Sequence, residues 1–152
     1  MADIEEKLAE LGVTLPDAPA PAANYVPYVV TGNTIYVSGQ ISIGPDGPII
    51  GKLGDTMDVA GGAAAAKVCA INLLAQARAA LGGDISRLRR VLKLTAFVNS
   101  AADFTQQPQV VNGASDFLVE VLGDAGRHAR SAVGATLPLG VAVEIEGIFE
   151  FD

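Results

Sequence analysis

Apolar residues recur at helical spacing in three segments of the chain. The spacing predicts a short helix over residues 3–11 and two long helices over residues 58–81 and about 108–122. Asp58 stands where an N-cap residue would begin the longest helix, and Pro108 suits the first turn of the last one. A glycine follows each segment, which marks where the three helices end.

The other apolar residues gather in short β-rich runs or alternate with polar residues, as in strands buried on one face. These runs predict strands over residues 25–30, 34–38, 91–99, 129–135 and 141–151. A Thr-Gly-Asn turn makes the first two a hairpin, and a Gly-Pro-Asp-Gly segment marks a second turn. The order of elements predicts an α+β fold: one mixed sheet with two long helices packed on one face.

The length of the chain fits one domain. Its 152 residues suit a single core, so residues 1–152 are expected to form one unit with an extra N-terminal helix at about 3–11. Residues 13–24, rich in proline and small side chains, predict an extended connector. The N-terminus shows no signal peptide, and no run approaches the length of a membrane span. We therefore expect a cytoplasmic protein that does not associate with membranes.

The charge balance is acidic and bears on the choice of partner. Ten Lys and Arg against seventeen Asp and Glu give a net charge of −7. This balance disfavours nucleic acid as a partner, because phosphate contacts need a basic surface. The one local basic group, Arg87, Arg89 and Arg90, is interpreted as a solvated turn before a strand.

The last two predicted strands carry the candidate chemistry. In the final strand Glu144 and Glu146 alternate with apolar residues, so both face away from the helices. Arg130 in the preceding strand can bind a carboxylate through two parallel hydrogen bonds. If Arg130 lies on the glutamate side, cation and carboxylate meet there, either in a small-acid site or in a cross-strand salt bridge. This flat, polar face becomes a pocket when another subunit covers it.

Other chemistries find little support in the sequence. His128 is the single histidine and has no cysteine near it, so no metal site is expected. There is no Gly-x-Ser-x-Gly nucleophile elbow, and the glycine-rich stretches lack the lysine of a phosphate loop. Cys69, the single cysteine, is interpreted as a buried structural thiol, and Tyr28 as a packing residue.

Four stretches occur in the order of one known family. They are GNTIYVSGQ at 32–40, LTAFVN at 94–99 followed by Asp103-Phe104, ARSAV at 129–133 followed by Leu137-Pro138, and VEIE at 143–146. Through these motifs the chain, from about Ala18 to Phe151, resembles the Rid/YjgF family of reactive intermediate deaminases. Members of this family are often labelled endoribonuclease L-PSP or translation inhibitor.

The resemblance implies a chorismate-mutase-like α+β fold and a homotrimer with clefts between subunits. Active members hydrolyse enamines and imines, such as 2-iminopropanoate, to 2-oxo acids and ammonia, without a metal or organic cofactor. By position, Arg130 matches the arginine that binds the substrate carboxylate, and Glu144 the glutamate that positions the attacking water. Tyr25 matches the aromatic residue lining the cleft, Ser38 a polar residue at the end of the early strand, and Asn112 a helix asparagine near the site.

Three features depart from the family pattern. Ala132 stands where many active members have a cysteine, and the stretch Thr105 to Gln109 is longer than in typical members. In addition, Tyr25 lies in Asn24-Tyr25-Val26-Pro27 instead of after a Gly-Pro pair. All three suggest a divergent branch. The leading hypothesis is a Rid-like deaminase for small carboxylated imines. The alternative is a non-catalytic trimeric module that binds a small carboxylic acid or metabolite, and a chorismate mutase on the same fold is a third interpretation.

Overall fold

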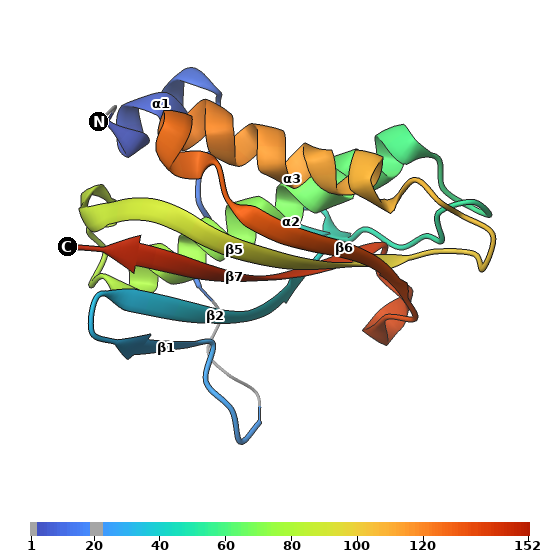
Figure 1. Ribbon diagram of the computed structural model, residues 1–152, viewed down its shortest axis with the longest axis horizontal. Coiled ribbons are helices and arrows are strands. Elements are labelled where there is room, and N and C mark those ends of the chain that lie inside the picture. The colour runs from blue at the N-terminus through green and yellow to red at the C-terminus, as the bar shows by residue number, and fades with distance from the viewer. Residues whose placement is uncertain (1–2, 19–22) are drawn as a thin grey trace.

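The chain folds into a curved five-stranded sheet with its two long helices on one face (Figure 1). The computed structural model describes residues 3–18 and 23–152. The helices are α1 (Ile4–Glu10), α2 (Val59–Ala80) and α3 (Gln107–Leu122), with 3₁₀ turns η1 (Ile85–Arg87), η2 (Gly123–Gly126) and η3 (Pro138–Gly140). The strands are β1 (Tyr28–Thr31), β2 (Thr34–Ile41), β3 (Ile43–Gly44), β4 (Gly47–Pro48), β5 (Leu88–Asn99), β6 (Ala129–Ala135) and β7 (Val143–Phe151).

The strand order of the main sheet is β1-β2-β7-β5-β6. Its pairs are antiparallel except for β5 and β6, which run parallel. Strands β3 and β4 form a separate small hairpin at the predicted Gly-Pro-Asp-Gly turn. The predicted α+β fold with one mixed sheet is therefore confirmed.

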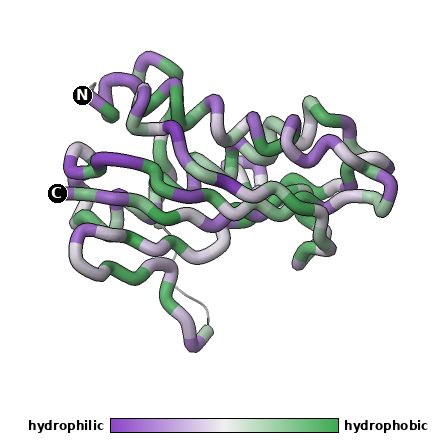
Figure 2. The backbone as a smooth tube through the Cα atoms, viewed as in Figure 1, coloured by the Kyte–Doolittle hydropathy of each residue, from purple (hydrophilic) through white to green (hydrophobic). Residues whose placement is uncertain are grey.

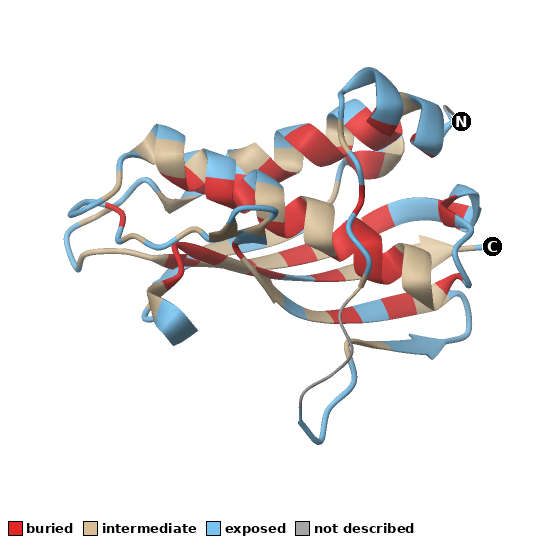
Figure 3. Ribbon diagram, turned by 180° about the vertical axis from the view of Figure 1, so that it is seen from behind, coloured by how far each residue is buried: buried red, intermediate tan, exposed pale blue. Residues whose placement is uncertain are grey.

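The core lies between the helices and the sheet face beneath them. Helix α2 packs on β2 and β7, while α3 packs on β5 and β6. Seen from behind, the buried residues line the inner sides of both helices and the sheet under them (Figure 3). A Cβ built on Gly113 of α3 would lie 2.0 Å from the carbonyl oxygen of Ala63 in α2, so the two helices meet backbone to backbone. Tyr28 packs against this core, as expected from the sequence.

The first turn of α2 is capped as the sequence predicts. The Asp58 carboxylate accepts a hydrogen bond from the Gly61 backbone N–H at 2.8 Å. Loss of such a cap leaves an N–H group of the first turn without its partner. We expect Asp58→Ala to lower the free energy of unfolding by about 1 kcal/mol, measured by urea unfolding with an unchanged m-value. Asp55→Ala in the exposed loop just before is the matched control, and an equal loss in both variants would contradict the capping role.

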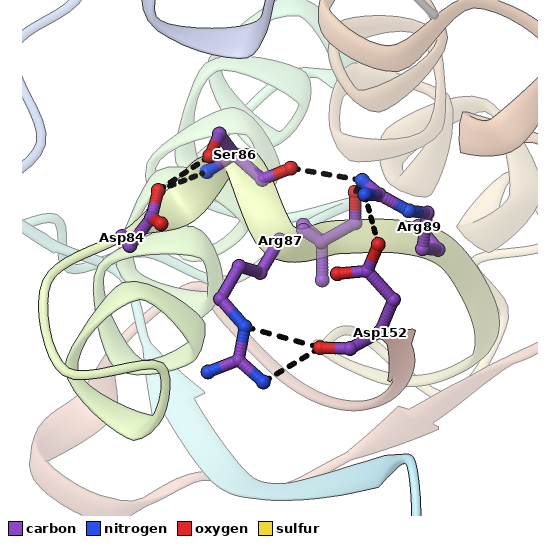
Figure 4. A network of polar contacts seen from close by, with 6 residues as sticks. Asp84, Ser86, Arg87, Arg89 and Asp152 are labelled. Carbon is purple, nitrogen blue, oxygen red and sulfur yellow. Dashed lines mark hydrogen bonds and ion pairs between the residues drawn. The ribbon is translucent and has the colours of Figure 1, made fainter.

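Arg87, Arg89 and Arg90 are exposed to solvent as expected, but only Arg87 lies in the turn before β5. Strand β5 starts at Leu88, which pairs with Phe151 of β7, so Arg89 already lies in the sheet. Arg87 donates from Nε and Nη2 to the Asp152 carbonyl oxygen at 3.0 and 2.6 Å, and Arg89 pairs with the Asp152 carboxylate (Figure 4). The strand is longer than predicted because Leu88 and Arg90 already pair with β7, while Arg87 and Arg89 hold Asp152 just after the end of β7.

Helix α2 also corrects an expectation. At 22 residues it is long and apolar enough, by length and composition, to cross a membrane. Its apolar character is explained by its place in the core, where Cys69, Leu73 and Leu74 are fully buried. The short helix α1 packs against α3 and η1 through the buried side chains of Ile4 and Leu8. Part of the predicted connector, residues 19–22, lies outside the described residues.

Candidate functional site

The two faces of β7 separate apolar from acidic side chains. Val143, Ile145 and Phe149 are fully buried under the helices. Glu144 and Glu146 alternate with them and lie on the opposite face of the sheet, which carries no helix and is called the open face below. The alternation of hydrophilic and hydrophobic segments along the strands is visible in Figure 2. The predicted orientation of this strand is therefore confirmed.

Arg130 does not share the open face with the glutamates. It pairs with Leu94 of β5, which pairs with Gly147 of β7, and both are buried on the helix side. Glu144 instead pairs with Phe97 of β5. Because directly paired residues project to the same side of a sheet, Arg130 points toward α3 while Glu144 points away. Arg130 and Glu144 therefore do not meet on one face of the sheet, and the cross-strand salt bridge between them does not form.

The Arg130 guanidinium is held by two neutral acceptors of α3. Its Nη1 donates to Ser115 Oγ at 3.0 Å, and its Nη2 donates to the Pro108 carbonyl oxygen at 3.2 Å. Within the described part of the chain, no carboxylate forms an ion pair with it. A guanidinium has five N–H donors in a planar fork, so donors remain for an anion. Arg130 lies on β6, the edge strand of the sheet, where a ligand can approach.

Asn112 and Ala132 belong to the surroundings of Arg130. Asn112 is exposed on α3, four residues after Pro108 and three before Ser115, so it shares a helix face with the two residues that hold the guanidinium. Ala132 is half-buried and projects to the same side of β6 as Arg130. The first part of the candidate site is therefore Arg130, Asn112 and Ala132, at the junction of β6 with α3.

The longer stretch before Asn112 forms the entry to α3. Residues 105–106 are loop, and the helix begins at Gln107. The Gln107 side chain donates to the Phe104 carbonyl oxygen at 2.9 Å, which fixes this entry. A Cβ on Gly134 of β6 would lie 2.8 Å from Ser100 Oγ, so Ser100, which directly follows β5, packs against β6.

Glu144 is the centre of a second part of the site. A Cβ on Gly39 would lie 2.6 Å from Glu144 Oε2, so the missing side chain at Gly39 makes room for the carboxylate. Burial raises the pKa of Glu144 above its ordinary value, and the charge of Glu146 raises it further. Next to Gly39, the Ser38 hydroxyl donates to the Val26 carbonyl oxygen at 2.8 Å. This bond anchors the segment that carries Tyr25, whose side chain is exposed.

The two parts lie apart in a single chain. Arg130 is on the edge strand and faces α3, whereas Glu144 is on the open face beside β2, with β5 between β6 and β7. The structure brings Arg130 together with Asn112 and Ala132, and it places Glu144 beside Gly39, the residue that follows Ser38. It does not join the two groups within one subunit.

Two residues beside Arg130 were not predicted as part of the site: Ser115 was not considered, and His128 was considered only as a metal ligand or catalytic base. His128 Nδ1 lies 2.6 Å from the Gly126 carbonyl oxygen, and His128 Nε2 lies 2.9 Å from Ser115 Oγ. Burial lowers the pKa of His128, and the charge of Arg130 lowers it further, against the opposing hydrogen bond to Gly126. Ser115 lies three residues after Asn112, and that helical spacing was the one signal in the sequence that could have placed it there.

The remaining groups considered in the sequence are the potential metal ligands and the single cysteine. No group of three or more His, Cys, Asp or Glu side chains that could hold a metal ion occurs in residues 3–18 and 23–152. Cys69 is fully buried, its thiol donates to the Val143 carbonyl oxygen at 3.4 Å, and burial raises its pKa. The thiol is therefore protonated and unreactive, as expected for a structural cysteine.

The topology and the placement of Arg130 and Glu144 define an α+β domain of the chorismate-mutase-like kind. The family model described as YjgF/chorismate mutase-like, putative endoribonuclease, matches residues 5–144, and the chain belongs to this family. Among curated proteins, Protein TCP17 of Trypanosoma cruzi is 47% identical over 98% of this chain and 94% of its own length.

Two solved structures share almost the whole fold. A protein of unknown function from Agrobacterium tumefaciens is 50% identical, with a TM-score of 0.91 over 98% of this chain and 92% of that one. A putative endoribonuclease from Shewanella oneidensis MR-1 is 31% identical, with a TM-score of 0.92 over 99% of this chain and 100% of that one. The Rid/YjgF resemblance seen in the motifs is thereby confirmed.

Proposed function

We propose that the protein is a Rid-like deaminase that hydrolyses small carboxylated imines and enamines to 2-oxo acids and ammonia. The observation that carries this proposal is the Arg130 guanidinium, which neutral acceptors hold in place and no carboxylate of the described chain neutralises. A fixed cation without a counter-ion favours a small anionic ligand, and the bidentate geometry favours a carboxylate.

The proposed catalytic unit is a homotrimer with clefts between subunits. Val29, Tyr36 and Val133 lie on the open face and remain about half exposed, at 53%, 48% and 46%. Apolar side chains left half exposed on one face of a sheet are typical of a surface covered by another subunit. Assembly through this face supports a cleft in which Arg130 of one subunit meets Glu144 of a partner copy.

The reaction follows from these two groups. Arg130 binds the carboxylate and holds the C=N carbon within reach of a water molecule. Glu144 accepts a proton from that water as its oxygen adds to the carbon of the protonated C=N bond, which gives a tetrahedral amino alcohol. Glu144 then returns this proton to the nitrogen, the C–N bond breaks and ammonia leaves, while the hydroxyl group gives its proton to Glu144 as the C=O bond forms. The raised pKa of Glu144 makes its carboxylate a stronger base than an exposed glutamate, which suits a group that accepts and returns a proton.

The non-catalytic binding module stays a second candidate because of Ala132. At this half-buried position the chain offers a methyl group, where many active members of the family have a cysteine. The cysteine has no required role as a nucleophile in the reaction above, yet its loss reshapes the site around Arg130. A protein that binds the acid without turning over the imine would keep Arg130 and have no use for Glu144.

The test of the proposed function compares imines with and without a carboxylate. An amino-acid oxidase generates 2-imino acids and an amine oxidase generates imines that lack a carboxylate, while semicarbazide traps both. We expect the protein, at catalytic concentration, to suppress semicarbazone formation from the 2-imino acids and to leave that from the other imines unchanged. Absence of any suppression would contradict the deaminase, and equal suppression of both would contradict carboxylate recognition.

A further inference from the structure

We propose that Ser115 and His128 are positioning residues that hold Arg130 and make carboxylate binding at this arginine responsive to the protonation of His128. The inference rests on the proposed role of Arg130 as the carboxylate ligand. Ser115 and His128 lie outside the four motifs that carry the family resemblance.

For the neutral ring of His128, the hydrogen bonds around it admit one consistent assignment. The Gly126 carbonyl oxygen only accepts, so His128 Nδ1, at 2.6 Å, carries the proton. The neutral ring then has a lone pair on Nε2, which accepts from the Ser115 hydroxyl at 2.9 Å. With its hydrogen directed to His128, the Ser115 oxygen presents its lone pairs to Arg130 Nη1 at 3.0 Å. The Gly126 carbonyl, His128, Ser115 and Arg130 therefore form one hydrogen-bonded series, from a backbone carbonyl to the guanidinium.

This hydrogen-bonded series fixes the orientation of the Arg130 guanidinium. Ser115 Oγ holds Nη1 and the Pro108 carbonyl oxygen holds Nη2, so α3 binds the planar group at two points. A side chain that is already ordered loses less conformational entropy when its ligand arrives. The positioning by Ser115 therefore supports tighter binding of a carboxylate without contact between Ser115 and the ligand.

Protonation of His128 places a second cation behind Arg130. Nε2 then becomes a donor, and the Ser115 oxygen accepts from both cations while its own hydrogen turns to the carbonyl of the preceding helical turn. In the empty site the charge of Arg130 opposes this protonation. A bound carboxylate offsets that charge, so ligand binding raises the pKa of His128. By thermodynamic reciprocity, protonated His128 binds the carboxylate more tightly.

Other charged groups near His128 are already engaged or exposed. On η2 and the segment after it, Asp124 pairs with Arg127 at 3.4 Å, and Arg90 of β5 donates to the Arg127 carbonyl oxygen at 3.1 Å. On α3, Asp116 and Glu120 are exposed to solvent. On β6 itself, Arg130 is the charge whose effect on the pKa of His128 is resolved.

His128 can be observed without ambiguity because it is the single histidine of the chain. We would follow its imidazole signals by nuclear magnetic resonance between about pH 5 and pH 8, with and without saturating pyruvate as a carboxylate probe. The expected result is an Nδ1–H tautomer with a pKa below the usual 6.5, which rises when pyruvate binds. An Nε2–H tautomer, or pyruvate binding that leaves the pKa unchanged, would overturn the inference.

Three variants separate positioning from a merely structural role. Ser115→Ala is expected to raise the Kd for pyruvate and the KM about tenfold with kcat unchanged, and Ser115→Thr, which keeps the hydroxyl, to restore both constants. In the native protein the Kd for pyruvate is expected to fall about fivefold from pH 8 to pH 5.5. His128→Gln keeps an acceptor for Ser115 but does not titrate, so its Kd is expected to lose this pH dependence. Equal pH dependence in both proteins would overturn the inference.

The design distinguishes failure of the inference from failure of the proposed function. If pyruvate binds but His128 does not respond, carboxylate binding stands and the coupling is wrong. If pyruvate does not bind at all, the carboxylate role of Arg130 fails. The measurement without pyruvate then tests the link between Arg130 and His128. Arg130→Gln is expected to raise the pKa of His128, because it removes a nearby cation. An unchanged pKa would contradict the hydrogen-bonded series that joins the two residues.

Discussion

Glu144→Gln is expected to lower kcat for imine hydrolysis by about 10²- to 10³-fold, because glutamine cannot take a proton from the attacking water. Binding of the product acid should change by less than about twofold, since the carboxylate is held by Arg130 and not by Glu144. The measurement is the oxidase-coupled semicarbazide assay together with calorimetric titration of pyruvate.

The control for this variant is Glu150→Gln. Glu150 lies on the same strand and the same face as Glu144, but it pairs with Thr34 and Arg90 at the far end of β7. It is expected to keep native turnover. Unchanged turnover in Glu144→Gln would remove the water-activating role from Glu144 and favour the non-catalytic binding module.

The same variant is expected to be more stable than the native protein at neutral pH. Since burial raises the pKa of Glu144 in the folded state, ionisation of this group costs folding free energy. That cost is absent below the pKa of the unfolded chain and grows as the pH rises to the folded-state value. Thermal unfolding should therefore show a higher Tm for Glu144→Gln at about pH 7, with a difference that shrinks toward about pH 4. A lower Tm at neutral pH would contradict this account of the carboxylate.

Arg130→Ala is expected to reduce kcat/KM for 2-imino acids by about 10²- to 10³-fold, because the carboxylate loses a charge-assisted, two-point contact. Arg130→Lys should recover only part of this loss, since an ammonium group keeps the charge but not the planar fork. Both variants are measured in the oxidase-coupled assay over a range of substrate concentrations.

The matched control for Arg130 is Arg127→Ala. Arg127 is exposed, precedes Arg130 by three residues and pairs with Asp124. Its removal is expected to leave kcat/KM within about twofold of the native value, as for most exposed ion pairs. Equal losses in both variants would mean that general positive charge, and not Arg130, attracts the substrate.

Much of the fold follows from local patterns in the sequence. The spacing of apolar residues predicts α3 within one residue at its start, and Asp58 marks the beginning of α2. Strand β6 has the predicted bounds, and the alternation along β7 correctly separates Glu144 from the core. These features depend on neighbours within a few residues, which a sequence displays directly.

The orientation of Arg130 could not be read from the sequence. It depends on the register of β6 against β5, which is set by strands more than thirty residues apart and by the packing of α3 over them. The early start of β5 is a similar case, because the contacts of Arg87 and Arg89 with Asp152 bridge more than sixty residues. The link between Ser115 and His128 likewise needs the rotation of α3 relative to β6.

The structure changes how the candidate site must be assembled. One subunit presents Arg130 toward α3 and Glu144 on the open face, so the two groups cannot act on one substrate molecule within a single chain. We therefore propose that a cleft between subunits combines Arg130 of one copy with Glu144 of another.

The most direct test of this claim is complementation between two inactive variants. Arg130→Ala and Glu144→Gln are unfolded, mixed in equal amounts and refolded together, and imine hydrolysis is compared with that of each variant alone. Because random assembly places an intact arginine and an intact glutamate in about a quarter of the clefts, we expect about a quarter of the native activity. Mixed oligomers of confirmed composition that remain inactive would contradict a site shared between subunits, and with it the proposed deaminase mechanism.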